Sequence, residues 1–298
     1  MLFEMFDPRF FNLIDADAQL EVLADNLIFT EGPVWHAKQK RLYFSDIPAD
    51  TLYRYQPSQG LSVFRQPSGF SNGLTLDSQG LLVACEHHTR AVTHQTQNGF
   101  EILADRYQGK RFNSPNDIIV AKDGSIIFTD PIYGLREGMG GPAEQELDFE
   151  GVYIIEPKET EPHLLLDDFE RPNGLALSLN EKLLYVIDTI RQHIRLFAVA
   201  TGWKVSEKGV FAELWGEGEG RPDGMKLDKQ GNIFCTGPGG IWVFSAQAEL
   251  LGKIHLSQKT ANLAWGDEDR RSLYITSSQY LYRLRCKTSG LSPLDNFL

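Results

Sequence analysis

Short runs of alternating apolar and polar residues recur along the chain, and they come in pairs joined by Gly-rich or polar turns. One pair joins residues 116–120 to residues 126–130 through the turn Lys122-Asp123-Gly124, and a similar pair joins 173–177 to 184–188. Alternation with a period of two, bounded by turn residues, is typical of half-buried β-strands. Capped amphipathic stretches long enough for a stable helix are missing. The pattern therefore predicts an all-β protein.

A short phrase with Asn, Asp or Glu precedes each pair of strands and marks the start of one repeat. The phrases Ser71-Asn72-Gly73, Arg171-Pro172-Asn173-Gly174 and Arg221-Pro222-Asp223-Gly224 each predict a tight turn. The six marked positions are 31, 72, 116, 173, 223 and 262, at separations of 41, 44, 57, 50 and 39 residues. A period of about 40 to 50 residues with paired short strands is typical of propeller blades. Six repeats therefore predict six blades.

Further strands complete the predicted blades. Residues 51–55 and 151–155 are rich in β-branched and aromatic side chains and follow the second strand of their repeats, which indicates four-stranded antiparallel blades. Residues 20–23 belong to no repeat, so we expect them to close the ring by pairing with the last blade. Linkers and domain boundaries are not evident. We therefore predict that residues 1–298 form a single six-bladed β-propeller domain, with residues 1–19 as an N-terminal extension.

Composition narrows the function classes. The 298 residues are 42% hydrophobic and 11% aromatic, enough for a large core. The formal net charge is -11, and no cluster of Lys or Arg suggests a nucleic-acid surface. An acidic chain instead suits solubility and the binding of cations. We expect no obligate protein partner.

The cysteines and the N-terminus indicate the compartment. Cys85, Cys235 and Cys286 are scattered and lack the paired spacing of zinc or redox sites, so we expect buried free thiols. Residues 1–11 contain charged side chains and do not resemble a signal peptide. No apolar stretch approaches the roughly 18 residues of a membrane span. We therefore expect a cytoplasmic protein that does not enter the membrane.

The marked residues also suggest chemistry. In a propeller, the segments that lead into the innermost strands converge on the central channel, and Glu31, Asn116, Asn173 and Asp223 lie in such segments. Two carboxylates and two amide oxygens are hard ligands, suited to Ca²⁺ or Mg²⁺. Any one of the Asn or Asp residues alone is explained by turn formation, but Glu is a poor turn former, so Glu31 needs another reason. The other two marked positions are Asn72 and Asn262. We interpret them as copies of the turn that only build blades.

Several motifs, in this order, resemble a known family: Glu31-Gly32-Pro33-Val34-Trp35, Leu42-Tyr43-Phe44-Ser45-Asp46, Asn113-Ser114-Pro115-Asn116-Asp117, Phe128-Thr129-Asp130-Pro131, Arg171-Pro172-Asn173-Gly174 and Arg221-Pro222-Asp223-Gly224. They are similar to the motifs of the SMP-30/gluconolactonase family of regucalcin-like lactonases, and within it to those of bacterial gluconolactonases. The animal regucalcin pattern differs, with Arg-Phe where this chain has Ser114-Pro115.

The resemblance implies a six-bladed propeller with a central divalent metal, commonly Ca²⁺, that hydrolyses sugar lactones. It implies metal ligation by Glu31, Asn116, Asn173 and Asp223, and an acid/base role for Asp223. One divalent cation is therefore the expected cofactor, with Ca²⁺ ahead of Mg²⁺, Mn²⁺ and Zn²⁺. The expected substrate is a lactone such as glucono-1,5-lactone.

The general base has more than one candidate. A carboxylate bound to a dication is a weak base, so Asp117 and His87 are alternatives to Asp223. His87 follows a predicted inner strand and either faces the channel mouth as a base or is a satisfied packing histidine. Asn116 and Tyr133 are the expected substrate contacts. Residues 134–150 are rich in Gly, Glu and Pro and form either an ordinary surface insertion or a loop that covers substrate.

Two alternative functions remain open from the sequence. The first keeps the metal but acts on phosphorus, as in propeller phosphotriesterases. The second is a non-catalytic propeller in which the metal only holds the blades together and a face binds a partner. Metal removal separates an enzyme from the non-catalytic propeller. An enzyme would lose activity and keep its fold, whereas a propeller held together by the metal would lose its fold.

Overall fold

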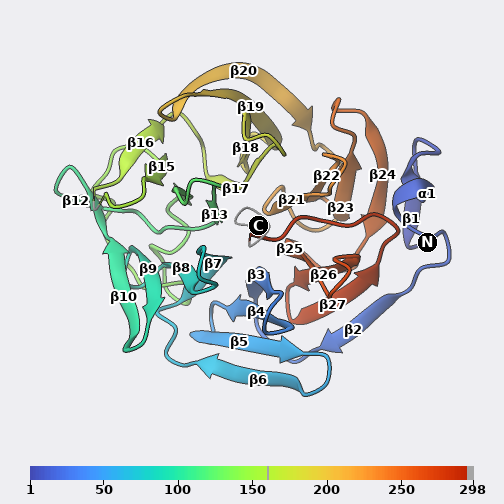
Figure 1. The fold of residues 1–298 in the computed structure, drawn as a ribbon, viewed down its shortest axis with the longest axis horizontal. Coiled ribbons are helices and arrows are strands. Elements are labelled where there is room, and N and C mark those ends of the chain that lie inside the picture. The colour runs from blue at the N-terminus through green and yellow to red at the C-terminus, as the bar shows by residue number, and fades with distance from the viewer. Residues whose placement is uncertain (160, 294–298) are drawn as a thin grey trace.

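Six antiparallel β-sheets are arranged as a ring around one central axis (Figure 1). The computed structural model describes residues 1–159 and 161–293. Each sheet contains four strands that follow one another outwards, except that one sheet has a fifth. The prediction of a six-bladed propeller with four-stranded antiparallel blades is confirmed.

Within each blade, the strands follow one another from the centre outwards. The first three blades are β3 (Thr30–His36), β4 (Arg41–Asp46), β5 (Thr51–Gln56) and β6 (Gly60–Arg65); β7 (Ser71–Leu76), β8 (Leu82–Glu86), β9 (Ala91–Thr96) and β10 (Gly99–Ala104); β13 (Ile118–Val120), β14 (Ile126–Asp130), β15 (Gly151–Ile155) and β16 (His163–Leu166). The last three are β17 (Pro172–Leu177), β18 (Leu183–Asp188), β19 (His193–Ala200) and β20 (Lys204–Glu213); β21 (Met225–Leu227), β22 (Ile233–Gly237), β23 (Gly240–Phe244) and β24 (Leu250–His255); β25 (Thr260–Gly266), β26 (Ser272–Ser277), β27 (Tyr280–Arg285) and β2 (Leu20–Ala24). A small hairpin, β11 (Arg106–Tyr107) with β12 (Lys110–Arg111), leads into the third blade.

The ring is closed by an N-terminal strand. β2 pairs antiparallel with β27, with Leu20 opposite Leu284 and Val22 opposite Tyr282. The last blade is thus built from both ends of the chain, as predicted for residues 20–23. This closure joins the first and last blades without leaving an open edge between them.

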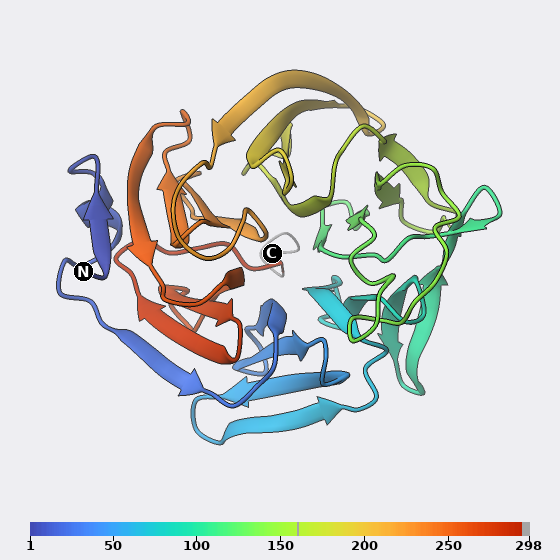
Figure 2. The same ribbon diagram turned by 180° about the vertical axis from the view of Figure 1, so that it is seen from behind.

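The N-terminal segment before β2 also belongs to the ring. β1 (Phe3–Met5) pairs with β24 as a fifth strand of the fifth blade, and the short helix α1 (Phe10–Leu13) packs beside it, as Figure 2 shows from behind. Phe10 and Ile14 are fully buried in the core between the fifth and sixth blades. Among residues 1–159 and 161–293, no helix is long and apolar enough to cross a lipid bilayer.

The apolar core lies between neighbouring blades rather than at the axis. Between the first and last blades, for example, Trp35 stacks on Tyr274 with ring centroids 5.4 Å apart. Cys85, Cys235 and Cys286 are buried and free, which confirms the prediction for the cysteines. Burial of apolar area between all six blades stabilises the ring and leaves polar side chains free to gather at the centre.

The marked phrases are not tight turns, so that prediction is wrong. The phrases at 72 and 173 lie within the innermost strands β7 and β17, at β-bulges. Their glycines have ordinary negative φ but lie against the next blade: Gly73 N donates to Asn116 O at 2.8 Å, and Gly174 N to Asp223 O at 2.7 Å. A Cβ at either glycine would lie 2.4 Å from that oxygen. The recurring glycine therefore serves close approach between blades at the axis.

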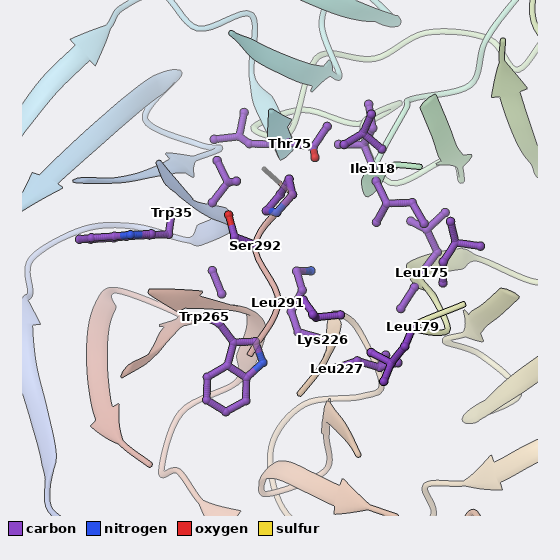
Figure 3. A pocket seen from close by; sticks show the side chains of 18 of the residues that line it. Trp35, Thr75, Ile118, Leu175, Leu179, Lys226, Leu227, Trp265, Leu291 and Ser292 are labelled. Atoms are coloured by element: carbon purple, nitrogen blue, oxygen red, sulfur yellow. The ribbon is translucent and has the colours of Figure 1, made fainter. Parts of the chain in front are cut away.

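The innermost strands leave a channel with a cavity at each end. One cavity, of about 460 Å³, is lined by residues further along these strands, such as Thr75, Ile118 and Leu175 (Figure 3). Leu291 and Ser292 of the segment after β27 reach it. The lining is mainly apolar. The other cavity lies where the innermost strands begin, and its lining includes the polar residues Glu31, Asn173 and Asp223.

Candidate functional site

A cavity of about 700 Å³ opens at the end of the channel where the innermost strands begin. Residues from five blades line it and are buried: Glu31, Asn72, Asn116, Asn173 and Asp223. The structure therefore brings together all four residues expected to hold a metal. Asn72, expected only to build a blade, lies in the same wall. Side chains that are far apart in the sequence meet here because every blade starts at the same end of the axis.

Glu31 and Asp223 form an electrostatically unfavourable pair. Their exposed fractions are 3% and 8%. Burial raises the pKa of Glu31 well above its usual range, and the nearby charge of Asp223 raises it further. Burial also raises the pKa of Asp223, to about 6, although the positive charge of Lys259 opposes the rise. Asp223 is therefore mostly ionised at neutral pH, whereas Glu31 needs a positive charge beside it to ionise there.

Asn173 offers an oxygen with no partner. Its Nδ2 donates to Thr189 Oγ1 at 3.2 Å, and Thr189 in turn donates to the carbonyl of Pro222. The buried Oδ1 of Asn173 accepts no hydrogen bond within the described part of the chain. A buried carbonyl oxygen without a donor is unfavourable unless a ligand or water contacts it. Asn116 is held by its backbone N–H, which donates to Thr129 O at 2.8 Å.

These residues fit a divalent cation. Carboxylate and amide oxygens are the ligands that Ca²⁺ prefers, two negative charges would balance its own, and the Asn173 oxygen would gain a partner. In the described residues, no group of three or more His, Cys, Asp or Glu side chains is placed to hold a metal. An ion in this cavity would therefore depend on the amides as well as on Glu31 and Asp223.

His87 lies in the cavity wall with an exposed fraction of 1%. Its Nδ1 is 2.7 Å from the carbonyl oxygen of Met139, which can only accept, so Nδ1 carries the hydrogen. Nε2 then has a free electron pair, which accepts from Asn72 Nδ2 at 3.3 Å. Burial lowers the pKa of His87 to about 4. The side chain is thus a neutral imidazole at neutral pH, and its basic nitrogen lies beside Asn72 of the cavity wall.

Asp117 does not line this cavity, although it is buried near the axis. Its Oδ1 accepts from the backbone N–H of Ile118 at 2.8 Å, and its Oδ2 lies 3.4 Å from Asn262 Nδ2. Both carboxylate oxygens therefore have partners in the wall behind the ligand cluster. Of the two alternatives to Asp223, only His87 lines the cavity, and Asn262 lies with Asp117 rather than in the cavity.

Tyr133 lines the cavity and is partly buried. Burial, and then the charge of Asp223, raises the pKa of Tyr133, so its phenol remains a hydrogen-bond donor. The Arg171 guanidinium lies 5.9 Å from the centre of its ring. Asp130, in contrast, is outside the cavity lining and accepts from the backbone of Asn113 at 2.7 Å.

The loop between β14 and β15 covers part of the cavity. Arg136 and Met139 belong to the lining. The loop is anchored through two carbonyls, because His87 Nδ1 contacts Met139 O and His88 Nδ1 contacts Gly140 O at 2.8 Å. Of the two interpretations of residues 134–150, the covering loop fits this geometry better than an ordinary surface insertion.

Sequence reasoning missed several lining residues. Thr189 follows β18, Arg221 lies two residues before Asp223, and Lys259 lies three residues before Asn262. The signal for Arg221 and Lys259 was position, because a side chain just before a marked residue lies at the same end of the axis, and Thr189 lies there because β18 runs antiparallel to β17. Nothing in their residue types distinguished them from ordinary loop residues.

Comparison with known proteins finds relatives that cover most of the chain. A sequence profile of the SMP-30/Gluconolactonase/LRE-like region matches residues 29–279. The gluconolactonase of Zymomonas mobilis is 34% identical over 309 residues, covering 96% of this chain and 86% of the relative. A pentonolactonase of Haloferax volcanii is 29% identical, covering 83% and 81%. The solved structure of a gluconolactonase from Xanthomonas campestris has a TM-score of 0.89 and 34% identity, covering 96% of this chain and 95% of that one.

Proposed function

Since this chain belongs to the SMP-30/Gluconolactonase/LRE-like family, we propose that it is a metal-dependent hydrolase that opens sugar lactones such as glucono-1,5-lactone to the aldonic acid. Lactone hydrolysis as such follows from its relatives, which are a gluconolactonase and a pentonolactonase. The choice of lactone and the metal are the proposal. The observation that supports the metal is the buried pair Glu31 and Asp223 beside the unpartnered oxygen of Asn173, and the choice of glucono-1,5-lactone follows the gluconolactonase relative.

Glu31, Asn116, Asn173 and Asp223 would hold the cation, with Ca²⁺ favoured by their chemistry. A bound divalent cation supplies Lewis-acid polarisation of the lactone carbonyl. Asn116 and the phenol of Tyr133 line the same cavity and would orient the sugar hydroxyls by hydrogen bonds.

His87 is the residue that we assign to proton transfer. Its Nε2, which accepts from Asn72 in the cavity wall, would exchange that contact for the water that adds to the carbonyl carbon and take up its proton. When the bond between the carbonyl carbon and the ring oxygen breaks, the same nitrogen would return the proton to the ring oxygen. The aldonic acid then ionises and releases one proton. The low pKa makes His87 a weak base but one that is always unprotonated near neutral pH.

The choice between a lactonase and a phosphotriesterase is tested by rates on both substrates. We expect metal-loaded protein to hydrolyse glucono-1,5-lactone with kcat/KM of about 10⁴ M⁻¹s⁻¹ or more, within the usual enzyme range. Proton release in a pH-stat, corrected for spontaneous opening, measures the lactone, and phenolate release measures an aryl phosphotriester. Hydrolysis of the triester with no acceleration of lactone opening would contradict the proposal.

Replacing His87 by Gln is expected to lower kcat by about 10²-fold or more, because the variant lacks a nitrogen base. Wild-type kcat should also fall as the pH decreases through about 4, where the imidazole takes up a proton and ceases to be a base. Protonation of Glu31 and Asp223 at acid pH should lower the rate of both proteins, but only wild type should show the additional fall near pH 4. His88→Gln is the matched control, since His88 contacts the same loop but not the cavity. Unchanged kcat and an unchanged pH profile in His87→Gln would remove His87 from the mechanism.

A further inference from the structure

Three cationic side chains from three different loops surround the mouth of the lactone cavity. Arg136 lies between β14 and β15, Arg221 between β20 and β21, and Lys259 between β24 and β25. All three are exposed and line the same cavity as the ligand cluster. Arg136 and Arg221 therefore face the part of a substrate that projects towards solvent, and Lys259 lies near the ligand cluster, where its charge also acts on Asp223.

The two arginines are unpaired. Neither guanidinium makes a hydrogen bond or an ion pair with the described residues, whereas Arg171 beside the same cavity pairs with Glu150. The Lys259 ammonium lies 4.6 Å from the centre of the Phe29 ring. In a chain with 40 acidic and 29 basic residues, carboxylate partners are abundant, so unpaired cations gathered at one opening are notable.

The backbone under these side chains is held in place. The carbonyl of Arg136 accepts from the N–H groups of Met139 and Gly141, and the carbonyl of Lys259 accepts from the Ser278 hydroxyl at 3.2 Å. The backbone at Arg136 and Lys259 is thus anchored, while the exposed charged ends of the side chains extend from it. Glu219 is the acidic side chain at this mouth that opposes them.

We propose that this mouth, formed by Arg136, Arg221 and Lys259, is a subsite for an anionic group on the sugar lactone. The proposal rests on the function proposed above. The lactone carbonyl must face Glu31 and Asp223, so the product carboxylate forms deep in the cavity and the mouth meets the opposite end of the sugar. The preferred substrate class is therefore a lactone with a phosphate, sulfonate or carboxylate remote from its carbonyl. Guanidinium groups bind such anions through paired hydrogen bonds.

The test compares a charged with a neutral substrate. We would measure kcat/KM for 6-phosphoglucono-1,5-lactone and for glucono-1,5-lactone with the metal-loaded protein, at low and at high salt. The phosphorylated lactone should be preferred by about 10-fold or more at low salt, and the preference should shrink at high salt because exposed charges are screened.

Variants assign the preference to named residues. The double variant Arg136→Gln/Arg221→Gln should lower the ratio of the two kcat/KM values by about 10-fold, and Glu219→Gln should raise it because an opposing charge is lost. Lys208→Gln, which removes a positive charge from the exposed outer strand β20, should leave the ratio unchanged.

The outcomes separate this proposal from the proposed function. Hydrolysis of both lactones with no preference, or a preference that the double variant leaves intact, would overturn the subsite alone. Failure to accelerate either lactone would overturn both. A loss of preference in Lys208→Gln as large as in the double variant would also overturn the subsite, because it would show that net charge rather than the mouth is responsible.

Discussion

Replacing Asp223 by Ala is expected to lower kcat for glucono-1,5-lactone by about 10³-fold while the β-rich circular dichroism spectrum is retained. The change removes one of two carboxylates in the cavity, so the cluster would no longer balance a dication. Loss of several kcal/mol of charge stabilisation in the transition state corresponds to a rate loss of this size. Asn173→Ala should act in the same direction, because it removes the unpartnered Oδ1.

The stability of the Asp223→Ala variant provides a second readout. Without metal, Glu31 and Asp223 have pKa values raised by burial, so their ionisation destabilises the folded state increasingly as the pH rises through the raised pKa values. Removing Asp223 relieves part of this repulsion. At neutral pH, the chelated variant should therefore unfold at a temperature no lower than that of chelated wild type.

Asp17→Ala, which removes an exposed carboxylate from the N-terminal segment, is the matched control. It should leave both kcat and the unfolding temperature unchanged. Wild-type turnover in Asp223→Ala and Asn173→Ala, measured with buffered free metal, would contradict the assignment of these residues. A chelated Asp223→Ala that unfolds far below chelated wild type would point instead to a purely structural carboxylate.

The period of the fold could be read from the sequence because each blade repeats one pattern of paired alternating strands. β2 was predictable as well, since residues 20–23 were left without a repeat of their own. β1 was not, because it pairs over three residues and its burial depends on Phe3 and Phe10 packing against a distant blade. Short strands with such distant partners carry little local signal.

The sequence indicated which marked residues meet at one cavity, but not how their backbone brings them there. Asn-Gly and Asp-Gly phrases usually indicate turns, and here that local rule was overridden by contact between neighbouring blades at the axis. Asn72 and Asn262 look equivalent in the sequence but have different neighbours in the structure. Asn72 lies beside His87 in the cavity, and Asn262 lies beside Asp117 behind it.

Removing the metal is expected to have the second large effect. Chelated protein should open glucono-1,5-lactone at little more than the spontaneous rate, because the lactone carbonyl would lack Lewis-acid polarisation. Without the ion, the carboxylates of Glu31 and Asp223 would also be partly protonated. The core between the blades does not depend on the cluster, so the fold should persist. Calcium at about 100 times its Kd should then stabilise the protein by about 2.7 kcal/mol. Unfolding on chelation would support the stapled, non-catalytic propeller instead.

The central claim is that an ion held by Glu31, Asn116, Asn173 and Asp223 is required for lactone hydrolysis. Its most direct test is a titration of chelated protein with Ca²⁺, with the rate of glucono-1,5-lactone hydrolysis followed in a pH-stat. We predict a rate that rises from the spontaneous level and saturates with one ion per chain. A chelated protein that already hydrolyses the lactone at its full rate, and does not respond to Ca²⁺ or to Mg²⁺, Mn²⁺ or Zn²⁺, would contradict the account.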